Sequence, residues 1–244
     1  MARATWESMF RVVRGAYMLV RKFGHSCVLA EQGETRILFD PPAPRFLFDG
    51  VTAASFGRLT AVVVTHFHPD HCDPGLLRRL SPAPIYGCQN IVTELRAHGL
   101  EATEFQTGSR RIGDLALRAC PAPHAAILGC EGPFNAAYLV GEELLVTGDS
   151  FDHALDIFRG VPLLTLPVLP PWANEIQIAE FAARMRPAAV VPVHDGMAKP
   201  FFLDSRYETF AIALQATDIR LVPLWTAEAV LDTAEVAAGT RKAE

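Results

Sequence analysis

Short apolar runs, each bounded by turn-forming residues, recur along most of the chain. Runs of this length with Gly, Pro or acidic residues on both sides are typical of β-strands. The segment 61–64 is apolar at every position, as in a strand buried on both faces. The first three runs, separated by turns, predict an antiparallel meander. In all, the pattern predicts strands at 17–20, 26–29, 36–39, 61–64, 84–87, 115–120, 134–140, 144–147, 189–193 and 219–222.

Helical spacing of apolar residues occurs between these strands. Asn174 and Gln177 fit a capping box, and the helix behind them places Ile178 and Phe181 on one face. Because the chain contains no linker, repeat or low-complexity segment, we expect one domain over residues 1–244. The ends at 1–14 and 233–244 are expected to be extensions. The predicted helices cover 74–80, 91–98 with Gly99 as C-cap, 175–186, and a segment capped by Asp204.

Composition narrows the classes of function. The net charge is −5 and no Lys/Arg cluster is longer than a pair, which disfavours binding to a long nucleic acid. The five cysteines are scattered without a Cys-x-x-Cys pair, which argues against a disulfide framework and predicts a reducing, cytoplasmic location. No apolar run reaches the length of a membrane span.

The clearest chemical signal follows the apolar run 61–64. His66 and His68 are two residues apart, so on an extended segment they point to the same side. Pro69 then bends the chain before Asp70 and His71. Imidazole nitrogens and carboxylate oxygens are ligands of borderline divalent metals, so this stretch predicts a metal site on a loop at the end of a core strand.

Four predicted strands end in a histidine or aspartate that could bind a metal. The four residues are His66, His124, Asp149 and His194, and each has Gly or Pro nearby, where the backbone turns sharply. Taken alone, a residue such as His124 is more simply explained as a loop histidine that faces water. Strand ends gathered at one edge of a pair of sheets, however, can bring distant residues into one cluster.

The pattern His-x-His-x-Asp-His at 66–71 resembles the metallo-β-lactamase superfamily. That resemblance implies an α/β (α+β) fold, the four-layer αββα sandwich, and two divalent metal ions, zinc first and manganese or iron as alternatives. It also implies that Asp149 bridges the metals and that Asp70 orients a hydroxide held between them. The implied ligands are His66, His68 and His124 for one metal, and Asp70, His71 and His194 for the other.

Further motifs resemble the UlaG-like branch of this superfamily, which includes ascorbate-6-phosphate lactonase and relatives of N-acyl phosphatidylethanolamine phospholipase D. One departure is Asp195-Gly196-Met197, where branch members often have an aromatic residue and Gly-Thr. The motifs that carry the resemblance are Gly24-His25, Leu38-Phe39-Asp40-Pro41, Cys72-Asp73-Pro74-Gly75, Gly148-Asp149-Ser150 and Pro192-Val193-His194.

Several residues near these motifs have two readings. His25 and Asp40 either hydrogen-bond to a ligand from behind or are only structural. His153 either protonates a leaving group or is a helix-surface histidine. Cys72 is expected to pack rather than to act as a nucleophile. Trp172 either lines the mouth of the pocket or belongs to the core.

These observations predict a hydrolase that uses a metal-bridging hydroxide to cleave a small ester, lactone or phosphodiester. The alternatives are a nuclease or phosphodiesterase acting on nucleic acid, and a non-catalytic metal-binding scaffold. The sequence leaves open a homo-oligomer. The loops that would select the substrate, at 41–50, 125–134 and 166–174, carry no decisive motif.

Overall fold

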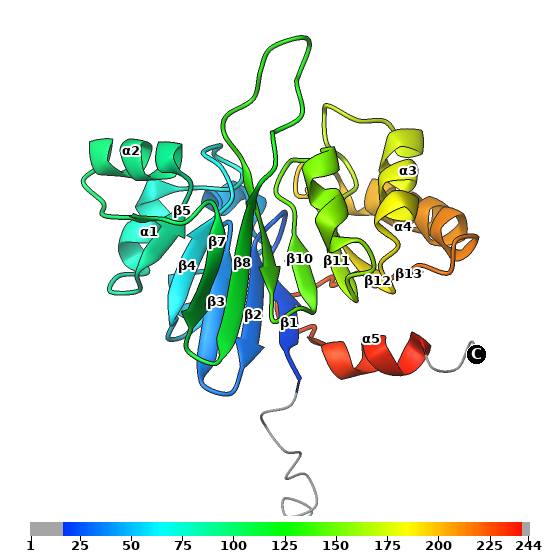
Figure 1. The fold of residues 1–244 in the computed structure, drawn as a ribbon, viewed down its shortest axis with the longest axis horizontal. Helices are drawn as coiled ribbons and strands as arrows, with labels where there is room; N and C mark the ends of the chain where they lie inside the picture. The colour runs from blue at the N-terminus through cyan, green and yellow to red at the C-terminus, as the bar shows by residue number, and fades with distance from the viewer. Residues whose placement is uncertain (1–16, 241–244) are drawn as a thin grey trace, which may run out of the picture.

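Two seven-stranded sheets form the centre of the computed structural model, which describes residues 17–240 (Figure 1). The first sheet has the order β14 (Leu231–Asp232), β1 (Leu19–Lys22), β2 (Val28–Gln32), β3 (Thr35–Phe39), β4 (Ala61–Val64), β5 (Ile85–Gly87) and β6 (Thr103–Glu104). The second has the order β13 (Arg220–Leu221), β12 (Ala189–Val193), β11 (Leu163–Pro167), β10 (Leu144–Val146), β9 (Ala136–Val140), β8 (Leu115–Pro121) and β7 (Gly108–Ile112).

Both sheets are antiparallel at one end and parallel at the other. In the first, β14, β1, β2 and β3 pair antiparallel, as the predicted meander requires, and β3 to β6 are parallel. In the second, β7 to β10 are antiparallel and β10 to β13 are parallel. Parallel neighbours need a crossover connection, which explains where the helices occur.

Helices cover the two outer faces of the sheet pair. In Figure 1, α1 (Pro74–Arg79) and α2 (Gln89–Ala97) lie on the side of β4 and β5, and α3 (Glu175–Met185) and α4 (Pro200–Gln215) lie beyond β11 and β12. The predicted four-layer αββα sandwich is therefore confirmed. Within residues 17–240, no helix combines the length and the apolar character that crossing a membrane requires. The remaining elements are the 3₁₀ segments η2 (Pro44–Phe46), η3 (Ala53–Phe56) and η4 (His153–Phe158), and helix α5 (Thr233–Thr240).

The core has two parts, as a layered fold requires. One buried cluster contains inward-facing residues of both sheets, for example Phe39 and Tyr138, together with residues of α1 and α2. The other lies between the second sheet and its helices and includes Phe181 and Phe210. Each such side chain contributes about 1.5–3 kcal/mol by leaving water. These two clusters hold the strands, and therefore the strand ends, in fixed positions.

The structure differs from the sequence-based expectation at several places. Strands β6, β7 and β14 were not predicted. Strand β11 was not predicted, because a short apolar run between prolines has no periodicity that separates a strand from other buried segments. Helix α4 begins at Pro200 with Lys199 as N-cap, so the expected cap at Asp204 is wrong. The tail after Asp232 continues as α5, and its Val236 is buried. The expected extension at 1–14 lies outside the described residues.

Candidate metal centre

Strand ends from both sheets deliver four buried side chains to one place. His66 follows β4 of the first sheet, and His124, Asp149 and His194 follow β8, β10 and β12 of the second. All four are at most 7% exposed. The loop after β4 supplies His68, Asp70 and His71. The structure thus brings together all seven residues that the sequence singled out as ligand types.

One group consists of His66, His68 and His124, whose nearest ring nitrogens lie within 4.8 Å of one another. His66 Nε2 and His68 Nδ1 are 3.1 Å apart. The other nitrogen of His66 contacts Thr65 Oγ1 at 3.0 Å, and His124 Nδ1 contacts the carbonyl oxygen of Ala125 at 2.6 Å. These outer contacts place the N–H of each ring outside the cluster and leave the Nε2 lone pair inside it.

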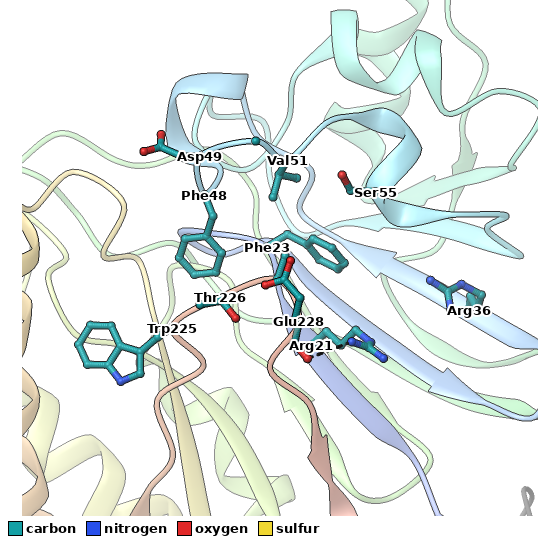
Figure 2. Close-up of a pocket in the computed structure, with 12 residues that line it drawn as sticks. Arg21, Phe23, Arg36, Phe48, Asp49, Val51, Ser55, Trp225, Thr226 and Glu228 are labelled. Carbon is teal, nitrogen blue, oxygen red and sulfur yellow. Dashed lines mark hydrogen bonds between the residues drawn. The ribbon is translucent and has the colours of Figure 1, made fainter. Parts of the chain in front are cut away.

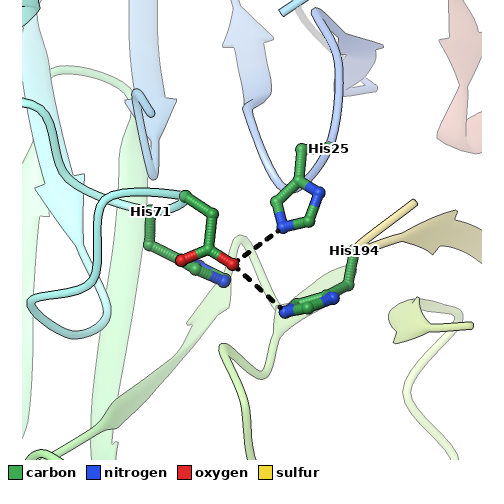
Figure 3. A group of neighbouring side chains, drawn as sticks. His25, His71 and His194 are labelled. Carbon is green, nitrogen blue, oxygen red and sulfur yellow. Dashed lines mark hydrogen bonds and ion pairs between the residues drawn. The ribbon is translucent and has the colours of Figure 1, made fainter. Parts of the chain in front are cut away.

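A second group consists of Asp70, His71 and His194, with His25 beside them (Figure 3). Asp70 Oδ2 lies 3.4 Å from His194 Nε2 and 3.2 Å from His25 Nε2. His71 turns its Nδ1 toward Asp40 Oδ2 at 2.9 Å, so its Nε2 faces the cluster. This group offers one carboxylate oxygen and two imidazole nitrogens to a cation.

Asp149 lies between the two groups. Its Oδ1 is 3.2 Å from His71 Nε2, and its Oδ2 is 3.1 Å from His194 Nε2 and 3.5 Å from His124 Nε2. The preceding Gly148 has φ +57°, and a Cβ there would come closer than 3.0 Å to both Asn135 and Thr65. Only glycine therefore lets the chain turn at the end of β10 and point Asp149 inward.

Asp40 fixes the back of the cluster. Its Oδ1 accepts a hydrogen bond from the Thr65 backbone N–H at 2.7 Å, and its Oδ2 accepts one from the Thr65 hydroxyl at 2.8 Å. The same Oδ2 accepts the Nδ1–H of His71. Asp40, His25 and His194 all have φ between +45° and +59°, which costs a non-glycine residue about 1 kcal/mol or more. Strain of this kind persists where the surroundings determine the conformation.

His25 contacts the second group as a hydrogen-bond donor. The Gly196 backbone N–H donates to His25 Nδ1 at 3.0 Å, so the proton of the neutral ring is on Nε2, which faces Asp70. Both nitrogens are thereby engaged, and no lone pair remains for a metal. Of its two sequence-based readings, this geometry matches the first, a hydrogen bond to Asp70 from behind.

Burial and neighbouring charges shift the pKa values of the clustered side chains in different directions. Burial lowers the pKa of His25 to about 4, against an opposing hydrogen bond to Asp70, and burial also lowers the pKa of His66 and of His68. These rings are therefore neutral at pH 7. Although burial acts in the opposite direction, Asp149 and Asp40 raise the pKa of His71, and His71 and His194 lower the pKa of Asp149.

The cluster contains unpaired polar atoms that a cation would satisfy. Within residues 17–240, His71 Nε2, His124 Nε2 and Asp149 Oδ1 are buried and have no hydrogen-bond partner. Leaving such an atom unpaired costs about 1–3 kcal/mol, so their convergence needs a reason. A divalent metal with nitrogen and oxygen ligands fits these residues.

Two of the other sequence candidates lie outside the cluster. The side chain of His153 is 83% exposed, and its Nδ1 contacts Asp156 at 3.0 Å; it also lines a cavity together with Trp172. Cys72 is buried, and burial raises the pKa of its thiol, which disfavours a thiolate nucleophile.

Contacts that sequence reasoning missed surround the cluster. Trp172 Nε1 donates to Asp149 Oδ2 at 3.3 Å. Lys22 is only 1% exposed and pairs with Asp195, next to His194. The available signal for Lys22 was its position two residues after the buried Val20, on the same face of β1.

Two small cavities adjoin the cluster. One of about 440 Å³ includes His124 in its lining. One of about 390 Å³ includes none of the seven clustered side chains, but it is lined by Phe151 and by Trp172, which contacts Asp149. A further cavity of about 790 Å³, lined by Phe48 and Trp225 among others (Figure 2), includes none of the seven clustered side chains in its lining. Volumes of 300–1,000 Å³ are typical of small-molecule sites.

Comparisons with known proteins agree with this geometry. A family model described as "Beta-lactamase superfamily domain" matches residues 19–194. Protein Rv0786c of Mycobacterium tuberculosis is 31% identical over 220 residues, which cover 84% of this chain and 97% of that protein. UPF0173 metal-dependent hydrolase TTHA1283 of Thermus thermophilus is 29% identical over 205 residues, with coverage of 79% and 89%. The metallo-β-lactamase fold protein YhfI from Bacillus subtilis has a TM-score of 0.68 at 17% identity, covering 89% of this chain and 100% of that one.

Proposed function

The chain belongs to the metallo-β-lactamase superfamily, and we propose that it is a metal-dependent hydrolase that holds two divalent cations and cleaves a small ester, lactone or phosphodiester. The observation that carries the proposal is the convergence of seven nitrogen- and oxygen-bearing side chains, four of whose buried atoms lack a hydrogen-bond partner within residues 17–240. The printed name of the Thermus thermophilus relative, a metal-dependent hydrolase, supports the reaction class.

The two groups and the residue between them define the proposed ligand roles. His66, His68 and His124 would hold one cation and Asp70, His71 and His194 the other, with Asp149 as a ligand shared by both. When bound, two such cations would supply Lewis acidity, which lowers the pKa of water to about 7 and polarises a carbonyl or phosphoryl oxygen. Zinc suits this ligand set best, and manganese and iron are the alternatives.

Residues of the cluster would position the reactants. Asp70 uses Oδ2 for its contacts with His25 and His194, so its Oδ1 is available to orient the attacking water. Trp172 and the His194 ring restrain Asp149 Oδ2 from two directions. The adjoining cavities of about 390 and 440 Å³ support a small substrate. A cytoplasmic location and assembly into a homo-oligomer stay predictions.

Metal analysis followed by activity panels tests the proposal. Protein purified without added ions should contain up to two divalent metals per chain, measured by mass spectrometry of the elements. Zinc- and manganese-loaded protein is then assayed against lactones, esters, phosphodiesters and RNA. Turnover of RNA alone would favour a nuclease, and two bound metals without turnover on any panel would favour a scaffold.

Single substitutions then connect the activity to the cluster. His66→Ala and Asp149→Ala should each reduce kcat/KM by more than about 100-fold and lower the metal content, because each removes a ligand. His98→Ala is the matched control, since His98 is exposed at the end of α2. Wild-type rates in the metal-poor His66→Ala and Asp149→Ala variants would contradict the mechanism.

A further inference from the structure

A buried lysine connects the first sheet to the turn that carries His194. Lys22, at the end of β1, is 1% exposed. Its Nζ donates to the carbonyl oxygen of Pro192 at 2.9 Å and pairs with Asp195 Oδ2. An ammonium group removed from water is strongly unfavourable unless it is paired and hydrogen-bonded, so this position has a specific requirement for its partners.

Asp195 is held from two sides. It follows His194 directly and is 3% exposed. Lys22 reaches its Oδ2 from β1, and the hydroxyl of Tyr207 donates to the same oxygen from α4. The carboxylate therefore joins three elements: a strand of the first sheet, the end of β12 and an outer helix.

Aromatic rings cover this network. The Phe48 ring centroid lies 5.9 Å from Lys22 Nζ, and the Tyr207 and Trp225 ring centroids are 4.6 Å apart. Phe48 and Trp225 are both labelled in the lining of the cavity in Figure 2. Phe48 and Trp225 thus lie between the network and that cavity, and the low exposure of Lys22 and Asp195 strengthens their hydrogen bonds.

The turn that contains Asp195 positions two histidines at the metal centre, His194 directly and His25 through Gly196. His194 has φ +59°, an unfavourable conformation that needs support from its neighbours. Gly196, on the other side of Asp195, donates its N–H to His25 Nδ1. That contact makes His25 donate to Asp70 Oδ2, which is also 3.4 Å from His194 Nε2.

We propose that Lys22, Asp195 and Tyr207 are positioning residues that fix the 194–196 turn and thereby set the orientation of His194 and His25. This inference rests on the proposed function in one respect. It assumes the cation assigned to Asp70, His71 and His194, because the network would set the affinity for that cation. The group of His66, His68 and His124 has no contact with the network among the described residues.

Tyr207→Phe tests the proposal by removing one hydroxyl. The first readout is the ¹⁵N NMR spectrum of the histidine rings in metal-free protein, where the signals of His194 and His25 should shift and those of His66 and His68 should not. The second is chelator competition with zinc, where one of two binding steps should lose about tenfold in affinity while the other stays unchanged.

Tyr138→Phe is the matched control. Tyr138 is fully buried in β9, and its hydroxyl donates to the carbonyl oxygen of Phe105 at 2.8 Å. The substitution removes the same atom and one buried hydrogen bond, so it should lower thermal stability and leave the His194 and His25 signals in place. Asp195→Asn, which keeps the shape and removes the charge, is the second test variant.

Two results separate this inference from the proposed function. Wild-type His194 and His25 signals in both Tyr207→Phe and Asp195→Asn, with only a stability loss like that of Tyr138→Phe, would overturn the positioning role. If the wild-type protein binds fewer than two metals, the two-cation proposal fails, but the ring signals of the metal-free variants still decide whether the network orients His194.

Discussion

An imidazole ring binds a cation only through a nitrogen that carries no proton, so hydrogen bonds behind the rings decide whether a histidine cluster is a metal site. Thr65, Asp40 and the Ala125 carbonyl group each accept the Nδ1–H of a clustered ring. The Nε2 atoms of His66, His71 and His124 consequently face inward. A cation at His71 would take the place of the proton that the raised pKa of this ring favours. Outer partners of this kind typically change metal affinity 10–100-fold.

Asp40→Asn should lower the affinity for the cation assigned to Asp70, His71 and His194. The amide removes the charge that holds the Nδ1–H of His71, and its NH₂ group competes as a donor. We expect a loss of about 10–100-fold in zinc affinity for that position, measured by chelator competition. Asp73→Asn is the control: Asp73 caps α1 by accepting from the Leu76 N–H, and asparagine caps equally well. Unchanged zinc affinity in Asp40→Asn would contradict this role.

Gly132→Ala should disturb the cation position of His66, His68 and His124. A Cβ at residue 132 would come closer than 3.0 Å to the Cγ and Nδ1 atoms of His124, so we expect the ring to shift. Cobalt loaded into the variant should show an altered visible absorption spectrum and a first-site affinity at least about tenfold weaker. Glu131→Ala alters the neighbouring exposed residue and should leave the spectrum unchanged. An unaltered spectrum in Gly132→Ala would mean that the loop moves instead of the ring.

Sequence reasoning was most successful for residues whose chemistry is unusual for their context. Three histidines and an aspartate in six positions identify the 66–71 loop without any structure. Lys22 and Asp195 were not recognised as partners because they are 173 positions apart. A charged residue on a buried strand face signals a partner but does not say which one. The Trp172–Asp149 contact likewise depends on tertiary structure alone.

At the scale of elements, strand ends were easier to predict than strand partners. Runs such as 61–64 and 189–193 identify themselves by continuous apolar character, and each ends at a ligand-type residue. β7 is exposed at four of its five positions, so it lacks the alternation that marks a half-buried strand. β11 is buried at all five positions, as β12 is, but its run is interrupted by Thr165 and lies between prolines. Three of the four ligand-bearing strand ends follow β4, β10 and β12, which are buried at every position, so these residues were found although part of the sheet order was not.

Helix α3 offers a test at this scale. Asn174 and Gln177 form a reciprocal capping box, with both bonds at 3.0 Å. Asn174→Ala should lower the free energy of unfolding by about 1 kcal/mol, measured by urea denaturation, because an N–H of the first turn loses its acceptor. Asn174→Asp should retain the cap and nearly all of the stability. Equal losses in both variants would show that the amide of Asn174 has another role.

At the scale of the whole molecule, the candidate centre joins the two sheets. His66 comes from the end of β4 in the first sheet, whereas His124, Asp149 and His194 come from strands of the second. Cations held by ligands from both sheets would connect the sheets at this edge. The folded chain brings these ligands together and the unfolded chain does not, so metal binding should stabilise the fold.

Metal removal should therefore lower Tm. Protein treated with a chelator and then dialysed should unfold at a lower temperature, and zinc at 100 times its Kd should restore about 2.7 kcal/mol per occupied site. Differential scanning calorimetry over a zinc series measures this shift, and Tm should rise with the logarithm of free zinc. The double variant His66→Ala/Asp149→Ala, with ligands of both positions removed, should show a much smaller zinc-dependent shift. A wild-type Tm that does not respond to zinc, manganese or iron would show that the seven side chains do not form a metal centre, because binding to the folded state alone must stabilise it.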